Sequence, residues 1–457
     1  MKKAIFSISI CLLLVVAQHH LLNPVSPIPL AVSKTIPNTP LTFSPDFLWG
    51  VTTAAYQIEG GIKNDWSHAG VDAKHAVEHQ KYWQKDIQDM KKMGLKSYRF
   101  SLSWARIEPS PGKWDEEAIL FYVRLVKSLK KENIEPLVSL WHFTQPQWFA
   151  EKGGWENPEN TQYYIRFIEK VIPYLSEDVD YWITVNEPMV YAIMAYFKGE
   201  WPPYIHSYTR WTKVFKHLLQ AHAMGYHTIH QLDTDAKVSL AKNIAILEPA
   251  NPQNPFDHLS QKIFHHLFNE SVWQAIQDGK LSISFPFYIG LREPLLKDSL
   301  DWIALHYYSR YFITATGKLL NRPGVSASYF HRDSYPEGLL RAIQMGYTYA
   351  RPRNLPIMIT ENGVEDATDA SRSRYLQDHI AQVWLAQQAG IPVQGYYHWT
   401  FMDNFEWVAG FTPKFGLLDR HRHWKLSAKT YQTIINHGIQ SDLSKADELD
   451  LQSLKKH

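Results

Sequence analysis

Residues 181–188 read Tyr-Trp-Ile-Thr-Val-Asn-Glu-Pro, a short apolar run that ends in an amide, a carboxylic acid and a proline. Residues 357–363 read Ile-Met-Ile-Thr-Glu-Asn-Gly and follow the same design. A short apolar run bounded by turn-forming residues predicts a buried strand. Both sequences therefore predict a strand that delivers a glutamate, Glu187 or Glu361, at its carboxyl end.

Similar apolar runs recur along the chain and alternate with longer amphipathic segments. Strands that alternate with helices predict parallel βαβ units, and eight of them predict one (β/α)8 TIM barrel of the α/β class, with long βα loops on the active-site face. The predicted strands are Leu48–Thr52, Ser97–Leu102, Glu135–Leu140, Tyr181–Val185, Lys237–Ala241, Trp302–Leu305, Ile357–Thr360 and Val393–Tyr397. The predicted helices include Tyr82–Met93, Glu116–Lys131, Trp211–His230 and Arg372–Ala389.

Polar or aromatic residues follow several of these strands directly. The carboxyl ends of barrel strands form the active-site face, so side chains gathered there indicate a site. The groups in question are Trp141-His142, Asn186-Glu187, His306-Tyr307-Tyr308, Glu361-Asn362-Gly363 and Trp399.

If the two glutamates share one cavity, they form a pair of neighbouring carboxyl groups, and such a pair is suited to acid-assisted nucleophilic catalysis. Taken alone, each is equally compatible with a solvated carboxylate or one paired with an arginine. Two neighbouring carboxyl groups do not both ionise easily, so one keeps its proton. Glycoside hydrolysis with retention needs this pair, because an acid protonates the leaving oxygen while a carboxylate attacks the anomeric carbon.

The ends of the 457-residue chain differ from its middle. Lys2 and Lys3 precede an apolar run at residues 4–17, which predicts a signal peptide over residues 1–17 and hence export; if uncleaved, the run is a membrane anchor. Residues 18–41 read as a linker, 42–437 as the barrel domain and 438–457 as a polar tail. The one cysteine, Cys11, lies in the apolar run, so thiolate and disulfide chemistry are excluded after cleavage.

Composition excludes some partners and fits others. A formal net charge of +2 without a basic cluster argues against nucleic acid. No stable membrane span beyond the leader is expected. Scattered histidines such as His75, His79, His265 and His266 lack metal-ligand spacing, so no metal is predicted. Tryptophan and tyrosine, at 17 and 25 residues, suit the apolar faces of sugars but suit a large core equally. Asn269-Glu270-Ser271 is a glycosylation sequon.

Six motifs occur in order between Phe47 and Leu417. They are Phe47-Leu-Trp-Gly-Val-Thr-Thr-Ala-Ala-Tyr-Gln-Ile-Glu-Gly60, Tyr98-Arg-Phe-Ser-Leu-Ser-Trp-Ala-Arg-Ile107, Thr184-Val-Asn-Glu-Pro188, Ile359-Thr-Glu-Asn-Gly363, Trp399-Thr-Phe-Met-Asp-Asn-Phe-Glu-Trp407 and Lys414-Phe-Gly-Leu417. In this set the chain resembles the family 1 glycoside hydrolases, the β-glucosidase family, from about Phe43 to His437. The resemblance implies a retaining β-glycosidase without a cofactor, acting on a small-molecule or oligosaccharide β-glycoside.

The resemblance also implies a role for individual residues. Glu187 matches the acid/base and Glu361 the nucleophile. Arg99, Asn186, Tyr308 and His306 take supporting positions around them, with Asn186 on the 2-hydroxyl of the sugar. The residues implied to bind sugar are Gln57, His142, Trp399, Glu406, Trp407 and Phe415.

Two positions depart from the family pattern. Phe143 stands where many members have tryptophan, and His306 stands where asparagine is usual before the tyrosine pair. His306 therefore raises a question of pH dependence or leaving-group preference. Glu406 would repel a phosphorylated sugar, so neutral sugars such as β-glucosides, β-galactosides or β-fucosides are expected.

Other functions stay open at this stage. One alternative is a non-catalytic sugar-binding or receptor-like module of the same fold, and another is a transglycosidase with the same two glutamates. The sequence does not determine the sugar, the leaving group or the oligomeric state.

Overall fold

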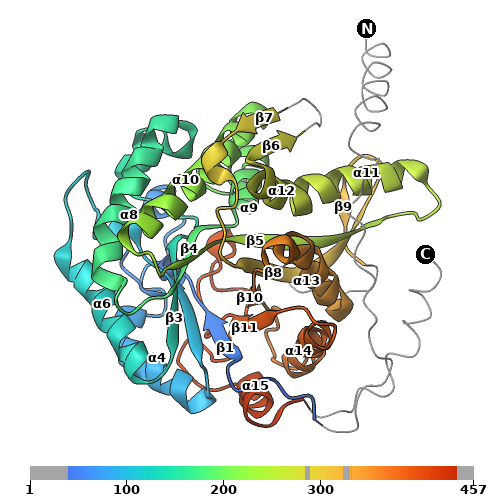
Figure 1. The fold of residues 1–457 in the computed structure, drawn as a ribbon. Helices are drawn as coiled ribbons and strands as arrows, with labels where there is room; N and C mark the ends of the chain where they lie inside the picture. Colours follow the sequence, from blue (N-terminus) through green and yellow to red (C-terminus); the bar gives the residue numbers. More distant parts are fainter. Residues whose placement is uncertain (1–39, 284–288, 323–329, 331, 440–457) are drawn as a thin grey trace.

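The computed structural model describes residues 40–283, 289–322, 330 and 332–439. Its centre is a closed ring of eight parallel strands, which confirms the predicted TIM barrel (Figure 1). The pairing of β8 with β10 closes the ring. In ring order the strands are β1 (Leu48–Thr52), β2 (Ser97–Ser101), β3 (Glu135–Trp141), β4 (Tyr181–Asn186), β5 (Lys237–Pro249), β8 (Ile303–Ile313), β10 (Ile357–Asn362) and β11 (Val393–Trp399).

Two strands are much longer than the sequence predicts. β5 and β8 were expected to end at Ala241 and Leu305, but they stay paired as far as Pro249 and Ile313. Parallel pairing continues past the polar Lys242 and Asn243. β9 (Leu319–Leu320) adds to this ribbon, and a separate hairpin, β6 (Lys280–Ile283) with β7 (Ile289–Arg292), was not predicted.

Helices surround the barrel (Figure 1). The long ones are α4 (His79–Met93), α6 (Glu116–Lys131), α8 (Thr161–Leu175), α10 (Tyr208–Leu232), α11 (Pro255–His265), α12 (Ser271–Asp278), α13 (Pro336–Ala350), α14 (Arg372–Gln388) and α15 (Leu426–His437). Shorter helices are α2 (Ala55–Ile58), α3 (Asp65–His68), α5 (Trp104–Ile107), α7 (Gln147–Glu151) and α9 (Pro188–Ala192). Single turns are η1 (Gly154–Glu156), η2 (Pro158–Asn160), η3 (Ile193–Phe197), η4 (His266–Glu270), η5 (Pro294–Leu296), η6 (Arg351–Arg353) and η7 (Trp407–Ala409).

Helix α6 shows why these segments fold locally. Asp115 caps its first turn by accepting a hydrogen bond from the Ala118 amide, and Glu116 and Glu117 lie at the positive end of the helix dipole. Ile119 and Tyr122 are among the residues that its apolar face buries against the barrel. The predicted bounds of this helix are correct, whereas the other three predicted helices differ from the observed ones by one to three residues at an end.

The inside of the barrel is filled by a small cluster of its own. It contains Leu137, Ile183, Ala241, Trp302, Ala304, Met358 and Tyr397. Gly50 of β1 lies beside Tyr397, and a Cβ at this glycine would stand 2.2 Å from the tyrosine ring. The packed interior closes the barrel below the strand ends, so the site can only lie above it.

The ends of the domain lie together. Leu41 and Ile439, both buried, exchange backbone hydrogen bonds of 2.9 and 3.0 Å. Leu41, from the predicted linker, and Ile439, from the predicted tail, therefore pack with the barrel. The predicted signal peptide, with Cys11, lies outside the described residues. In the part of the chain that the structure describes, no helix combines the length and hydrophobicity needed to cross a membrane.

The sequon asparagine, Asn269, lies inside the folded protein. Its side chain is fully buried and exchanges hydrogen bonds of 3.0 and 2.8 Å with the backbone of Ala245. An asparagine held in this way is not available for glycosylation in the folded protein.

Candidate active site

The backbone around both glutamates is tightly constrained. Glu187 follows β4 with a left-handed φ of 44°, and Pro188 then starts α9. Strained backbone of this kind is found preferentially at functional sites. After β10, a Cβ at Gly363 would lie 2.0 Å from the Trp399 carbonyl oxygen, so only glycine lets these two strand ends approach.

Glu361 is held by two strong donors. Arg99 Nη1 donates to its Oε1 at 2.6 Å, and the Tyr308 hydroxyl donates to its Oε2 at 2.6 Å. Arg99 is itself fully buried on β2 and also donates to Asn186 Oδ1 at 2.6 Å. A carboxylate that accepts a charge-assisted pair of hydrogen bonds is favoured as the anion and is fixed in orientation.

Glu187 lies in a less charged environment. Its Oε1 accepts hydrogen bonds from His306 Nδ1 at 2.7 Å and Asn243 Nδ2 at 2.9 Å. Burial raises the pKa of Glu187, although the Asn243 hydrogen bond and nearby cations such as Lys242 oppose the shift. The two carboxyl groups thus differ in the way that an acid and a nucleophile must differ.

The separation of the two carboxyl groups is short. An oxygen of each, together with a ring nitrogen of His306, lies within 4.8 Å of the others. Retaining glycosidases place their carboxyl groups ~5–5.5 Å apart, whereas inverting enzymes leave ~6.5–9.5 Å for a water molecule. The observed proximity fits retention. The same three groups are ligand types that bind metals, but Arg99 donates to this carboxylate and to this imidazole, which disfavours a cation there.

The residues implied to bind sugar surround the glutamates. Gln57 Nε2 donates to Glu406 Oε2 at 3.1 Å, and the His142 ring lies nearly parallel to both Trp399 and Trp407 at 6.0 and 5.9 Å. Gln57 Oε1 and His142 Nδ1 are buried polar atoms without a hydrogen-bond partner among the described residues. Such atoms suit the hydroxyl groups of a sugar.

Several of these side chains have shifted protonation equilibria. Burial raises the pKa of Glu406 to about 7, although the charge of Arg332 opposes this. Burial, assisted by the charge of Arg99, holds the pKa of His142 well below its usual value. Asn186 links the two halves of the site, because its Nδ2 lies 3.2 Å from His142 Nε2 while its oxygen accepts from Arg99. Phe415 is buried within 5.7 Å of the Arg332 guanidinium.

Two residues near the glutamates were not predicted. Asn243 contacts Glu187, and its position after the predicted fifth strand obeys the same rule that revealed the other residues. Arg332 stacks on the Tyr308 ring at 4.6 Å. It precedes α13 and does not follow a barrel strand, so the rule about strand ends does not reveal it.

Comparison with known proteins agrees with this geometry. Residues 39–439 match the pattern of Glycosyl hydrolase family 1. The chain belongs to this family. Beta-glucosidase A of Acetivibrio thermocellus is 30% identical over 424 residues, covering 83% of this chain and 93% of the relative. The solved β-glycosidase from Pyrococcus horikoshii has a TM-score of 0.81 and 33% identity, covering 87% of this chain and 96% of that one.

A more distant family member carries another name. The chloroplastic galactolipid galactosyltransferase of Arabidopsis thaliana is 29% identical over 382 residues, covering 79% of this chain and 58% of the relative. Family membership, the TIM barrel and the adjacent carboxyl groups together make this protein an O-glycoside hydrolase, a retaining β-glycosidase.

Proposed function

We propose that the protein hydrolyses terminal, non-reducing β-linked neutral sugars, with Glu187 as acid/base and Glu361 as nucleophile. The observation that carries this assignment is the contrast between the adjacent carboxyl groups. Arg99 and Tyr308 bind Glu361 at 2.6 Å, whereas burial raises the pKa of Glu187. β-Glucosides are the first substrates to test, because relatives include proteins named as β-glucosidases.

The reaction proceeds in two displacements. Glu361 attacks the anomeric carbon while Glu187 transfers its proton to the leaving oxygen, which forms a glycosyl ester and releases the alcohol. Glu187, now ionised, removes a proton from water as the water oxygen attacks the same carbon. The ester bond breaks in the same step, Glu361 leaves as carboxylate, and the sugar retains its β configuration.

The sugar pocket favours a neutral ligand. Glu406 presents a carboxyl group beside Gln57 and Trp407, and its ionised form would repel a phosphate on the sugar. Hydroxyl groups instead can donate to this carboxyl and accept from the amide of Gln57. Phosphorylated sugars should therefore be poor substrates.

Glu361→Ala tests the assignment directly. The variant should lose at least about 10³-fold in kcat on nitrophenyl β-glucoside, and azide should restore turnover with an inverted glycosyl azide as product. Nitrophenyl β-galactoside and β-fucoside, run in parallel, rank the sugars. The exposed Glu159 supplies a control, because Glu159→Ala should keep wild-type turnover. Unchanged activity in Glu361→Ala, or no turnover by folded wild type on the whole panel, would reject the proposal.

A second candidate is transfer of the sugar to an alcohol other than water. It is favoured by one relative that is named as a galactosyltransferase. The same glycosyl ester would then react with an acceptor hydroxyl that Glu187 deprotonates. Product analysis with added glycerol or a second glycoside separates the two outcomes, because free sugar reports hydrolysis and a new glycoside reports transfer.

We also propose export of the protein. The basic start and the apolar run of residues 4–17 support a signal peptide. N-terminal sequencing of the mature protein after expression in a secreting host would identify cleavage near residue 17 or an uncleaved anchor.

A further inference from the structure

His306 lies between the two glutamates and is fully buried. Its Nδ1 is 2.7 Å from Glu187 Oε1 and 3.4 Å from Glu361 Oε2. Its Nε2 is 3.0 Å from Arg99 Nη1. No other described side chain is close to both carboxyl groups and the buried arginine through hydrogen-bonding atoms on opposite sides of one ring.

The partner at Nε2 determines the form of this imidazole. An arginine guanidinium has donors only, so Nε2 must accept and cannot carry a proton. The single proton of a neutral imidazole then lies on Nδ1. Burial supports the neutral form, since it lowers the pKa of His306 to about 3. His306 therefore donates from Nδ1, and the shorter distance directs that bond to Glu187 rather than to Glu361.

The donor also determines which oxygen of Glu187 can be acidic. Oε1 already accepts from His306 Nδ1 and from Asn243 Nδ2, so both of its lone-pair directions are occupied. A proton on Glu187 must therefore lie on Oε2. We infer that His306 is a positioning residue that directs the acidic proton of Glu187 to Oε2 and stabilises the carboxylate left after proton transfer.

This inference rests on the proposed roles of Glu187 and Glu361 and adds a direction to the proton transfer. When Oε2 loses its proton, the Nδ1–H bond becomes a bond to an anion and strengthens. His306 thus favours the ionised form of Glu187, against the effect of burial. The titratable or charged groups that act on the imidazole from the surrounding strands are Arg99 (β2), His142 (after β3), Glu187 (after β4), Lys242 (β5) and Glu361 (β10).

The test compares two substitutions of His306. Leucine removes both nitrogens at similar volume. Asparagine places an N–H donor at the position of Nδ1, because both nitrogens are bonded to the γ carbon. His379 supplies the matched control, since it is another fully buried imidazole whose pKa is lowered by burial to about 3, and its Nδ1 is bonded to the Tyr375 carbonyl.

The pH profile of kcat/KM is the first readout. In His306→Leu the alkaline limb, which reports loss of the acidic proton, should move up by about one to two pH units. In His306→Asn and in His379→Leu it should stay at the wild-type position. An unmoved limb in His306→Leu, or an equal displacement in the asparagine variant, overturns the inference.

The leaving group is the second readout. An alkyl β-glycoside needs a proton on its leaving oxygen, so His306→Leu should lower its kcat/KM by about 10- to 100-fold. A dinitrophenyl glycoside needs no proton, and its kcat/KM should fall by less than about threefold. Equal losses on both substrates would mean that His306 only maintains the shape of the site, and would overturn the inference.

The inference can fail separately from the proposed function. Wild-type turnover with unchanged limbs in the leucine variant rejects only the role of His306. The tautomer is also measurable without turnover, by ¹⁵N NMR of the imidazole in the resting enzyme. A neutral ring protonated at Nδ1 between pH 5 and 8 is expected, and protonation at Nε2 or at both nitrogens contradicts the argument.

Discussion

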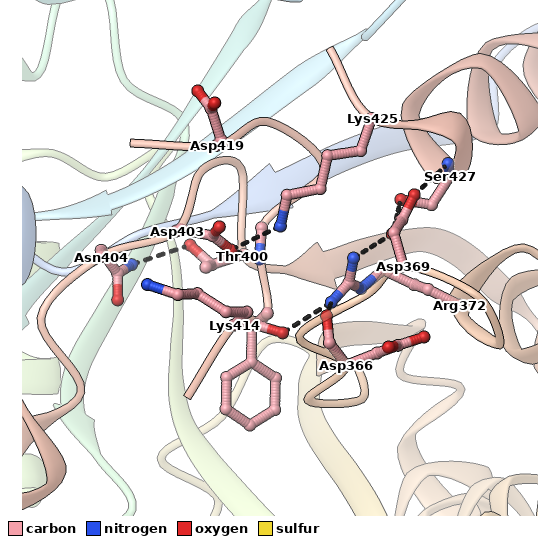
Figure 2. A network of polar contacts seen from close by, with 12 residues as sticks. Asp366, Asp369, Arg372, Thr400, Asp403, Asn404, Lys414, Asp419, Lys425 and Ser427 are labelled. Carbon is pink, nitrogen blue, oxygen red and sulfur yellow. Dashed lines mark hydrogen bonds and ion pairs between the residues drawn. The ribbon is translucent and has the colours of Figure 1, made fainter. Parts of the chain in front are cut away.

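Two groups of charged side chains, both largely buried, are built differently. The group at the proposed active site contains Glu187, Glu361 and Glu406, and Arg99 is the ion-pair partner of only one of them, Glu361. The second group joins the loop after β11 to helices α14 and α15 (Figure 2). Among the described residues, neither Glu187 nor Glu406 has a lysine or arginine ion-pair partner, whereas Asp369 and Asp403 of the second group pair with Arg372 and Lys425.

Two carboxylates of the second group are paired with cations. Arg372, whose side chain is buried, binds Asp369 and donates to the carbonyls of Asp366 and Lys414 at 2.8 and 2.6 Å (Figure 2). Asp369 also accepts from Ser427, and Asp403 pairs with Lys425 at 2.7 Å.

The pKa values of the carboxyl groups also differ between the two groups. Burial alone would raise the pKa of Asp366, but hydrogen bonds from Ser371 and Thr368 lower it to about 2. Glu406 has one amide donor, Gln57, and its pKa is raised by burial to about 7. In these two groups, the carboxyl groups near Glu361 are therefore short of cations, whereas those of the second group are held by a cation or by several hydrogen-bond donors.

The largest effect is expected from the second group. Arg372→Met removes the cation and leaves Asp369 and two carbonyls without their donor, so the free energy of unfolding should fall by about 3–5 kcal/mol. The limbs of the kcat/KM profile should not move, because Arg372 does not contact either catalytic carboxyl group. Chemical denaturation and the pH profile at a permissive temperature measure the two outcomes.

Arg374 on the same helix is the control. It is exposed and pairs with Asp378 at 2.7 Å, one turn further along. Arg374→Met should cost only about 0.3–0.5 kcal/mol, as is usual for exposed pairs at this spacing. A similar loss of unfolding free energy in Arg372→Met and Arg374→Met would mean that the buried ion pair is worth no more than the exposed one.

Sequence reasoning reaches the elements whose pattern is local. Glu187 and Glu361 were predictable because each follows an apolar strand, and parallel strands must deliver their ends to one face. Asn243 was missed because the fifth strand was predicted to end at Ala241. In the structure, pairing with β8 extends this strand as far as Pro249. Arg332 was missed for another reason, since it belongs to no helix or strand and no period in the sequence marks its place beside Tyr308.

An intermediate effect is expected at Glu406. Glu406→Gln keeps the volume and a hydrogen-bonding group but removes the charge that accepts sugar hydroxyls. The value of kcat/KM should fall by about 10- to 100-fold, from the ~1.5–3 kcal/mol of a hydrogen bond to a charged group. Kinetics on the ranked nitrophenyl glycosides measure this loss, and Glu159→Gln on the surface should show none.

The same variant tests the raised pKa of Glu406 through stability. The native carboxyl has a pKa of about 7 against an ordinary value of 4.5, so between these pH values the folded protein binds more protons than the unfolded chain. The wild type should therefore lose stability as pH rises through this window, and the glutamine variant should lack this component. The difference in Tm between the two proteins should shift in favour of the variant from pH 4.5 to 7. A constant difference would contradict the view that Glu406 is uncompensated.

The smallest effect is expected from two adjacent tyrosines on β8 that point to different sides. Tyr308 donates to Glu361, whereas Tyr307 donates to the Tyr335 carbonyl at 2.7 Å and packs beneath α13. Tyr308→Phe should lower kcat/KM about tenfold with little change in Tm, because one of two donors to the proposed nucleophile is lost. Tyr307→Phe should do the reverse, lowering the free energy of unfolding by about 1 kcal/mol while sparing turnover. Equal losses of activity in both variants would contradict this distinction, because Tyr307 does not contact Glu361 and only Tyr308 should affect turnover.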